Sequence, residues 1–110
     1  MNIQIFGKSK SFDTKKAERW FKERRIKYQY IDLNRYGMSR GELNSVIAAV
    51  GLDKIVDPAD QDYELFIRLA RREDKIEKLF DIPEMILAPV VRNGKQATVG
   101  YCPDVWKTWE

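Results

Sequence analysis

The start of the chain combines a strand, a helix and a second strand, and this order limits the possible folds more than any other feature. Residues 3–6 favour β-structure, residues 13–25 carry apolar side chains at helical spacing, and residues 28–33 are rich in tyrosine and aliphatic side chains. Two strands that are joined through a helix cannot form a hairpin. They therefore predict a parallel pair with a right-handed crossover.

The last third of the chain predicts a β-hairpin that is followed by a closing helix. Residues 89–92 and 95–101 are β-prone, and Asn93-Gly94 between them indicates a two-residue turn because both residue types tolerate positive φ. Pro103 fits the first turn of the closing helix. The complete order of elements predicts an α/β fold with a four-stranded mixed sheet.

The middle of the chain predicts a helical insertion, residues 39–82, between the two parts of this sheet. Ser39 and Glu42 have the spacing of a capping box, and Gly51 is placed to end the helix that they begin. The length fits one domain, so we expect residues 1–110 to form a single domain that includes this insertion.

Two shorter helices are expected in the second half of the insertion, over residues 61–72 and 75–80. Each segment has apolar residues at helical spacing, which would form its buried face. The residues expected to face inward in the first of these helices are Leu65, Phe66, Leu69 and Ala70.

The composition excludes several kinds of site. The 110 residues include one cysteine and no histidine, so an intrachain disulfide and imidazole metal sites are excluded. No apolar run reaches the ~18 residues of a membrane span, and the first residues lack the pattern of a secretion signal. We therefore expect a soluble cytoplasmic protein with no metal and no membrane partner.

The loop between the first strand and the first helix is a common place for a reactive thiolate. A helix N-terminus stabilises negative charge through its dipole and its free N–H groups. The residues here are Lys8, Ser9, Lys10 and Ser11, with Thr14 in the first helical turn, and none of them is a cysteine. The scaffold therefore suggests thiol chemistry at a place where the thiol is missing.

Short strings over nearly the whole chain occur in an order that is typical of one protein family. They are Phe6-Gly7, Lys15-Lys16-Ala17, Tyr30-Ile31-Asp32-Leu33, Ser39-Arg40-Gly41-Glu42-Leu43, Val50-Gly51-Leu52, Ala88-Pro89-Val90-Val91 and Val99-Gly100-Tyr101. Their order and spacing resemble the arsenate reductase-like branch of the thioredoxin superfamily, which includes the Spx-type transcription regulators. The resemblance implies a thioredoxin-like, glutaredoxin-like fold with a redox or regulatory role.

The same resemblance shows where the chain departs from the family. Ser11 stands at the position of the nucleophilic cysteine, and Thr14 stands at the second cysteine of a Cys-x-x-Cys motif. Ala88 replaces an arginine that helps to hold an oxyanion, and an acidic segment at residues 56–58 lies where another basic residue is expected. The resemblance therefore implies a degenerate active site.

The loop residues themselves allow two interpretations each. Ser11 is either a weak nucleophile or, as we expect, a helix N-cap. The loop and the first helical turn also hold Lys8, Lys10, Lys15 and Lys16. These lysines either form an anion site at the helix N-terminus or, as we favour, lie on a solvated charged face.

Four further residues are candidate site residues. Phe12 is either an exposed anchor for a partner or an inward-facing side chain against Trp20 or Pro89. Pro89 stands where the family places a cis proline, and we expect a cis bond. Cys102 is either a reactive thiol, with a pKa lowered by a helix N-terminus, or a small half-buried hydrophobe, which we favour. Gly51 aligns roughly with a glycine that Spx-type regulators present to RNA polymerase, although helix termination also explains it.

Two functional hypotheses follow. The first, which we favour, is a catalytically inactive arsenate reductase-like or Spx-like protein that binds either a protein, such as the transcription machinery, or a small anion. It needs no cofactor and acts in transcriptional or stress regulation. The alternative is an arsenate or thiol–disulfide reductase that uses glutathione or Cys102. The basic clusters at residues 22–27 and 68–72 alternate with acids and lack stacking aromatics, which argues against direct nucleic-acid binding.

Overall fold

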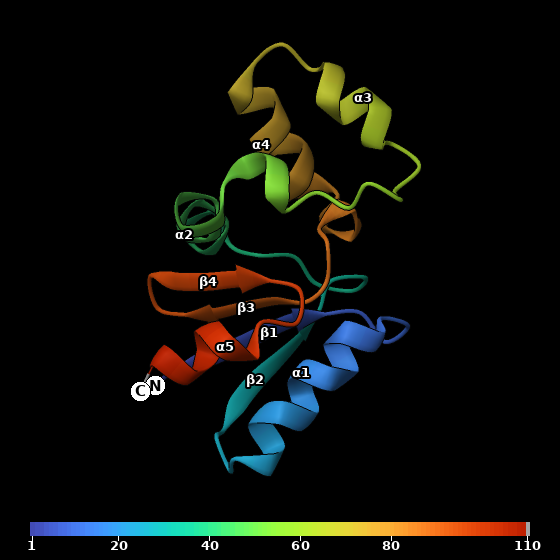
Figure 1. Cartoon of the computed structure of the whole chain (residues 1–110). Helices are drawn as coiled ribbons and strands as arrows, with labels where there is room; N and C mark the ends of the chain where they lie inside the picture. The colour runs from blue at the N-terminus through green and yellow to red at the C-terminus, as the bar shows by residue number, and fades with distance from the viewer. Residues whose placement is uncertain (110) are drawn as a thin grey trace.

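The computed structural model describes residues 1–109 and is built around a four-stranded mixed sheet (Figure 1). The strands are β1 (Ile3–Gly7), β2 (Tyr28–Asp32), β3 (Val90–Asn93) and β4 (Gln96–Val99), and they lie in the order β2-β1-β3-β4. Strand β1 pairs parallel with β2 and antiparallel with β3, and β3 pairs antiparallel with β4. This confirms the predicted α/β fold with a four-stranded mixed sheet.

Helices cover both faces of the sheet, as Figure 1 shows. Helix α1 (Phe12–Glu23) and the short helix α5 (Pro103–Trp106) lie on one face, and α2 (Arg40–Val50) lies on the other. Because side chains alternate along a strand, β1 serves both layers. Ile3 and Ile5 belong to the buried cluster with α1 and α5, and Phe6 belongs to the cluster with α2.

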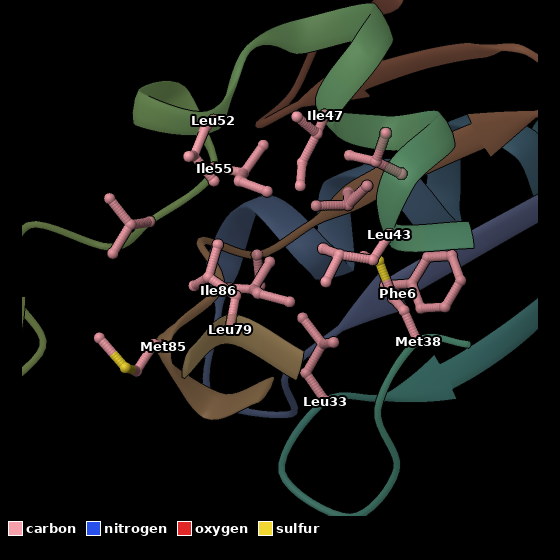
Figure 2. Packing of buried hydrophobic residues seen from close by; sticks show 14 of the residues in the cluster. Phe6, Leu33, Met38, Leu43, Ile47, Leu52, Ile55, Leu79, Met85 and Ile86 are labelled. Atoms are coloured by element: carbon pink, nitrogen blue, oxygen red, sulfur yellow. The ribbon is translucent and has the colours of Figure 1, made fainter. Parts of the chain in front are cut away.

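The helices between β2 and β3 build the larger of these two buried clusters (Figure 2). Helix α2 is followed by the 3-10 turn Leu52–Lys54, α3 (Tyr63–Arg68), α4 (Arg72–Asp81) and the 3-10 turn Pro83–Met85. Buried side chains from α2, α4 and the segment before β3 converge with Phe6 on the sheet. Within residues 1–109, no helix combines the length and the apolar character that crossing a membrane requires.

The capping box that begins α2 is confirmed. The Ser39 hydroxyl accepts a hydrogen bond from the Glu42 N–H at 3.1 Å, and the Glu42 carboxylate accepts one from the Ser39 N–H at 2.9 Å. Gly51 ends the helix with φ of 102°, a conformation that side chains disfavour. The sequence therefore predicted both ends of this helix correctly.

The helix expected over residues 61–72 is shorter than predicted. Helix α3 spans only Tyr63–Arg68, and residues 72–81 belong to α4. Phe66 is fully buried as expected, but Leu65 is 60% exposed and Ala70 is also exposed. The spacing of the apolar residues suggested one long buried face, but a six-residue helix buries only one side chain fully.

The predicted hairpin exists, but its turn is displaced by one residue. Asn93 pairs with Gln96, so the two turn residues are Gly94 and Lys95 and not Asn93-Gly94. Of these two, only Gly94 has positive φ, at 61°, which suits a glycine in the first turn position. The Asn93 side chain is bonded instead, because it accepts a hydrogen bond from the Asn2 N–H and donates one to Gln96.

An aromatic cluster joins α1 to α5. Trp20, Phe21 and Trp106 lie with ring centroids 4.8–5.3 Å apart. The indole N–H of Trp106 donates a buried hydrogen bond of 2.8 Å to the hydroxyl of Thr98 on β4. The first and last helices are thus held on the same face of the sheet by packing and by one satisfied buried polar pair.

Replacement of glycine by alanine should have opposite effects on the free energy of unfolding at Gly7 and at Gly41. A Cβ atom at Gly7 would lie 2.4 Å from Cγ2 of Thr14 and 2.9 Å from Cε1 of Tyr30, whereas a Cβ atom at Gly41 meets nothing within 4 Å. Gly7→Ala should therefore lower the free energy of unfolding by about 1–3 kcal/mol. Gly41→Ala, the matched control inside α2, should raise it by about 0.5–1 kcal/mol. Urea denaturation measures both, and a neutral Gly7→Ala would contradict the close contact.

Glu42 predicts a pH dependence of stability. Burial alone would raise the pKa of Glu42, but hydrogen bonds from the Ser39 N–H and the Gln4 amide outweigh it, so this pKa lies below its usual range. Such a carboxylate adds stability above its unfolded pKa, and the contribution is lost as pH falls through the folded pKa.

We therefore expect Glu42→Gln to reduce the loss of unfolding free energy between neutral pH and about pH 3, measured by urea denaturation at each pH. The same substitution at the exposed Glu73 is the control and should leave that loss nearly unchanged. An equal acid sensitivity of the Glu42→Gln variant and the original protein would rule out this role.

Candidate functional site

The loop between β1 and α1 is closed by its own hydrogen bonds. Ser11 is the N-cap of α1, and its hydroxyl accepts a hydrogen bond of 3.1 Å from the Thr14 N–H. The Ser11 N–H donates in turn to the carbonyl of Lys8 at 3.0 Å. Ser11 therefore has the N-cap geometry that we favoured, and its oxygen is occupied as an acceptor.

Thr14 fills the space behind this loop. Its side chain is 1% exposed, and its hydroxyl accepts a hydrogen bond of 3.3 Å from the Lys8 N–H. The close approach to Gly7 described above involves the Thr14 methyl group. The two positions that the resemblance aligns with cysteines thus carry hydroxyls that bond to the backbone of the loop.

The peptide bond between Ala88 and Pro89 is cis, as predicted. Both residues are buried, and the Pro89 carbonyl accepts a hydrogen bond of 2.8 Å from the Gly100 N–H. Ala88 packs within the cluster around Phe6. At the position that the resemblance aligns with an arginine, the chain therefore has a methyl group in the hydrophobic core, which offers no donor to an anion.

Cys102 lies just before α5 and is half-buried. Burial raises the pKa of its thiol above the usual value, and the nearby Asp13 carboxylate raises it further. The thiol donates a hydrogen bond of 3.3 Å to the Val99 carbonyl. The lowered pKa considered for this residue is therefore wrong, because the four-residue helix after it does not outweigh burial and a neighbouring negative charge.

Phe12 is the most exposed large hydrophobic side chain of the described residues, at 79%. It stands at the first position of α1, with the Lys15 ammonium 5.8 Å from its ring centroid. One turn further along α1, the Lys16 ammonium lies 5.8 Å from the ring centroid of Tyr101, which is also exposed. We call these four residues, Phe12, Lys15, Lys16 and Tyr101, the Phe12 face.

The lysines around the loop do not point to one centre. The Lys8 ammonium donates a hydrogen bond of 2.6 Å to the Glu84 carbonyl, so it faces the 3-10 turn before β3. Lys15 and Lys16 lie over two different aromatic rings, and Lys10 is exposed. The structure therefore brings Phe12 and Lys15 together but does not gather Lys8, Lys10 and Lys15 around Ser11.

Sequence reasoning missed two contributors to this region. Tyr101 carries no site signal in the sequence beyond its place in a family string, and its pairing with Lys16 appears only when the segment after β4 is folded near α1. Glu84 contributes a backbone carbonyl, which has no side-chain signal at all. The described residues contain no group of three or more side chains placed to hold a metal ion.

A hollow lies on the surface next to this region. It has a volume of about 480 Å³ and lies between the loop after β2 and the end of α4. Arg35, Asp81 and Glu84 contribute charges of both signs to its lining, and none of the predicted site residues lines it. The hollow borders the loop before α1, because the Lys8 ammonium bonds to the carbonyl of Glu84, but Ser11 and Thr14 are not part of its lining.

Comparison with known proteins finds relatives of one kind. No protein-family model matches the chain. The chain is 27% identical over 110 residues to the global transcriptional regulator Spx 2 of Oceanobacillus iheyensis, and the match covers 94% of this chain and 80% of that protein.

The solved structures that resemble the chain share its fold over nearly their whole length. A putative ArsC family related protein from Bacteroides fragilis matches with a TM-score of 0.85 and 19% identity, and all of both chains is covered. An arsenate reductase from Vibrio cholerae matches with a TM-score of 0.82 and 19% identity, over 96% of this chain and 94% of that one. These findings agree with the resemblance seen in the sequence: the chain has the fold of the arsenate reductase-like proteins and is similar over most of its length to an Spx-type regulator.

Proposed function

We propose that this protein is a non-catalytic member of its family that acts by binding a partner protein through the Phe12 face. The observation that carries the proposal is the state of the two hydroxyls at the thiol positions. Ser11 caps α1, and Thr14 is buried and bonded to Lys8, so neither side chain is free to act as a nucleophile. A serine would also need a neighbouring base, and the chain has no histidine.

The Phe12 face has the chemistry of a protein-binding surface. An exposed aromatic ring supplies apolar area at a small cost in side-chain entropy, and such rings often anchor interfaces. Lys15 and Lys16 place positive charge beside the rings of Phe12 and Tyr101. We therefore infer a partner that covers Phe12 with an apolar pocket and presents acidic side chains to the two lysines.

A protein partner fits these observations better than a small anion does. An anion site needs several donors that point to one place. Here the Lys8 ammonium is engaged by the Glu84 carbonyl, and Lys15 and Lys16 lie over separate rings. Charge spread over a wide face suits an acidic surface, while a single phosphate or arsenate would meet only one lysine at a time.

The partner that we propose belongs to the transcription machinery of the cytoplasm. The support is the relative named a global transcriptional regulator, which this chain matches over most of its length. Direct contact with nucleic acid is not part of the proposal, because the basic segments of the chain are mixed with acidic residues.

The second candidate is a reductase that uses glutathione or Cys102, and it is favoured by the likeness to a solved arsenate reductase. The raised pKa of Cys102 argues against it, since the thiolate is the nucleophile in such chemistry. Purified protein with arsenate, glutathione and a glutaredoxin system distinguishes the two. We expect no arsenate-dependent turnover above that of a Cys102→Ser control, and clear turnover would overturn the non-catalytic proposal.

Replacing the capping serine by cysteine should create a reactive thiol. In Ser11→Cys, the N-terminus of α1 would lower the pKa of the new thiol, whereas burial raises that of Cys102. Each unit of pKa near neutral pH changes the thiolate fraction about tenfold. We therefore expect iodoacetamide at pH 7 to label position 11 at least about tenfold faster than Cys102, read by peptide mass spectrometry.

The same experiment in a Cys102→Ser background isolates the new thiol. Equal labelling rates at the two positions would mean that the loop no longer offers an environment for a thiolate. Fast labelling of Cys102 in the original protein would favour the reductase hypothesis.

Removing the exposed ring should weaken partner binding. We expect Phe12→Ala to reduce the affinity for RNA polymerase purified from the source organism by about 2 kcal/mol, or about 30-fold, measured by surface plasmon resonance. Leu65→Ala removes another exposed apolar side chain, on α3, and is the matched control. An unchanged affinity of the Phe12→Ala variant would exclude this face, and absence of any binding by the original protein would exclude this partner.

A further inference from the structure

Strand β4 forms one edge of the sheet and presents a row of unpaired backbone groups. The Gly100 N–H donates a hydrogen bond to the Pro89 carbonyl, so Gly100 faces the neighbouring strand. This bond determines which of the preceding residues of β4 bond to β3 and which face outward. In an antiparallel pair, alternate residues turn both backbone groups toward the neighbouring strand. Gln96 and Thr98 therefore bond to β3, while Ala97 and Val99 direct their N–H and C=O groups away from the sheet.

This edge lacks most of the devices that protect sheet edges. Natural edges are blunted by charged side chains, prolines or bulges, and β4 has neither a charged residue nor a proline. The Val99 carbonyl already accepts a hydrogen bond from the Cys102 thiol. No other backbone group among residues 1–109, outside the sheet itself, bonds to Ala97 or Val99. Three backbone groups on this edge thus remain for a further strand.

A groove runs along the same edge. Its volume is about 410 Å³, and we call it the β4 groove. Ala49 and Val50 at the end of α2 line it, together with Leu87, Lys54, Cys102 and residues 97–99. Lys54 is the one charged residue of this lining. The groove therefore offers apolar contacts, open backbone hydrogen bonds and a single positive charge.

We propose that the β4 groove binds an extended segment of a partner protein, which adds to the sheet as a fifth strand. Partner carbonyls would accept from the N–H groups of Ala97 and Val99, and a partner N–H would donate to the Ala97 carbonyl. Apolar side chains of the segment would pack on Val50 and Leu87, and a carboxylate would pair with Lys54. Strand addition of this kind combines backbone bonds for affinity with side-chain pockets for specificity.

Charge complementarity favours an acidic partner segment over β4 of a second copy of this chain as the occupant of the groove. The sequence of β4 is Gln-Ala-Thr-Val, which has no acidic side chain to pair with Lys54. A β4 strand from another copy would therefore leave that charge unmatched. The proposal is independent of the Phe12 face, since the two surfaces share no residue.

The test uses two defined peptides and the full chain. The probe is acetyl-Val-Glu-Val-Glu-Val-amide, and its control is acetyl-Val-Lys-Val-Lys-Val-amide. We expect the glutamate peptide to shift the amide NMR signals of residues 96–99 and of Val50, and to slow hydrogen exchange at Ala97 and Val99. The lysine peptide should bind at least about fivefold more weakly, because Lys54 repels it.

Two variants complete the test. Ala97→Pro removes an N–H that makes no bond within the sheet, so the ladder is kept while the edge loses one donor. Lys54→Glu reverses the charge of the groove without touching the backbone, and Lys27→Glu is its exposed control. Ala97→Pro and Lys54→Glu should each lower the affinity for the glutamate peptide about fivefold, and Lys27→Glu should leave this affinity unchanged.

Several results would overturn the proposal. They are the absence of any shift along β4, shifts confined to the Phe12 face, and equal binding of the two peptides. Unchanged affinity of the Lys54→Glu variant would have the same consequence, even if Ala97→Pro failed to fold. Pairing of two chains through β4, detected by sedimentation of the free protein, would also count against a foreign segment.

Discussion

The pairing of β1 with strands on both sides is the constraint on which the rest of the structure depends. Ile5 lies between Tyr30 of β2 and Val91 of β3, and it is fully buried. This one strand joins the beginning of the chain to its last third and supplies side chains to both hydrophobic layers. Strand β1 ends at Gly7, where the chain leaves the sheet. The position of this strand end therefore determines where the loop before α1 lies.

The loop itself is ordered by hydroxyl groups. Its hydrogen bonds run between Ser11, Thr14 and Lys8, and its packing depends on the contact between Thr14 and Gly7. Capping of α1 and closure of the loop therefore require no sulfur. The shape of this scaffold is thus maintained separately from any chemistry that the loop could carry.

Local signals in the sequence predicted much of the fold, because they act over a few residues. The capping box at Ser39 and the helix end at Gly51 follow from residue types at fixed spacing, and the structure has both. The strand–helix–strand order at the start required a parallel pair, which is also present. The cis bond before Pro89 was expected from family resemblance alone.

What the sequence could not supply depends on contacts between distant segments. The hairpin turn lies one residue later than predicted, and Asn93 instead pairs within the sheet and accepts a hydrogen bond from Asn2 near the start of the chain. The pKa of Cys102 is raised by burial and by Asp13, neither of which is visible from the residues around it. The direction of Lys8 toward Glu84 and the groove beside β4 likewise appear only when the helical insertion is packed on the sheet.

The aromatic cluster between α1 and α5 also determines what intrinsic tryptophan fluorescence reports about this molecule. All three tryptophans of the chain, Trp20, Trp106 and Trp109, belong to the buried cluster on that face, and the cluster under α2 has none. Intrinsic emission therefore reports the environment of one layer only. Loosening of α3 and α4 would pass unseen by indole fluorescence and would need a reporter placed in those helices.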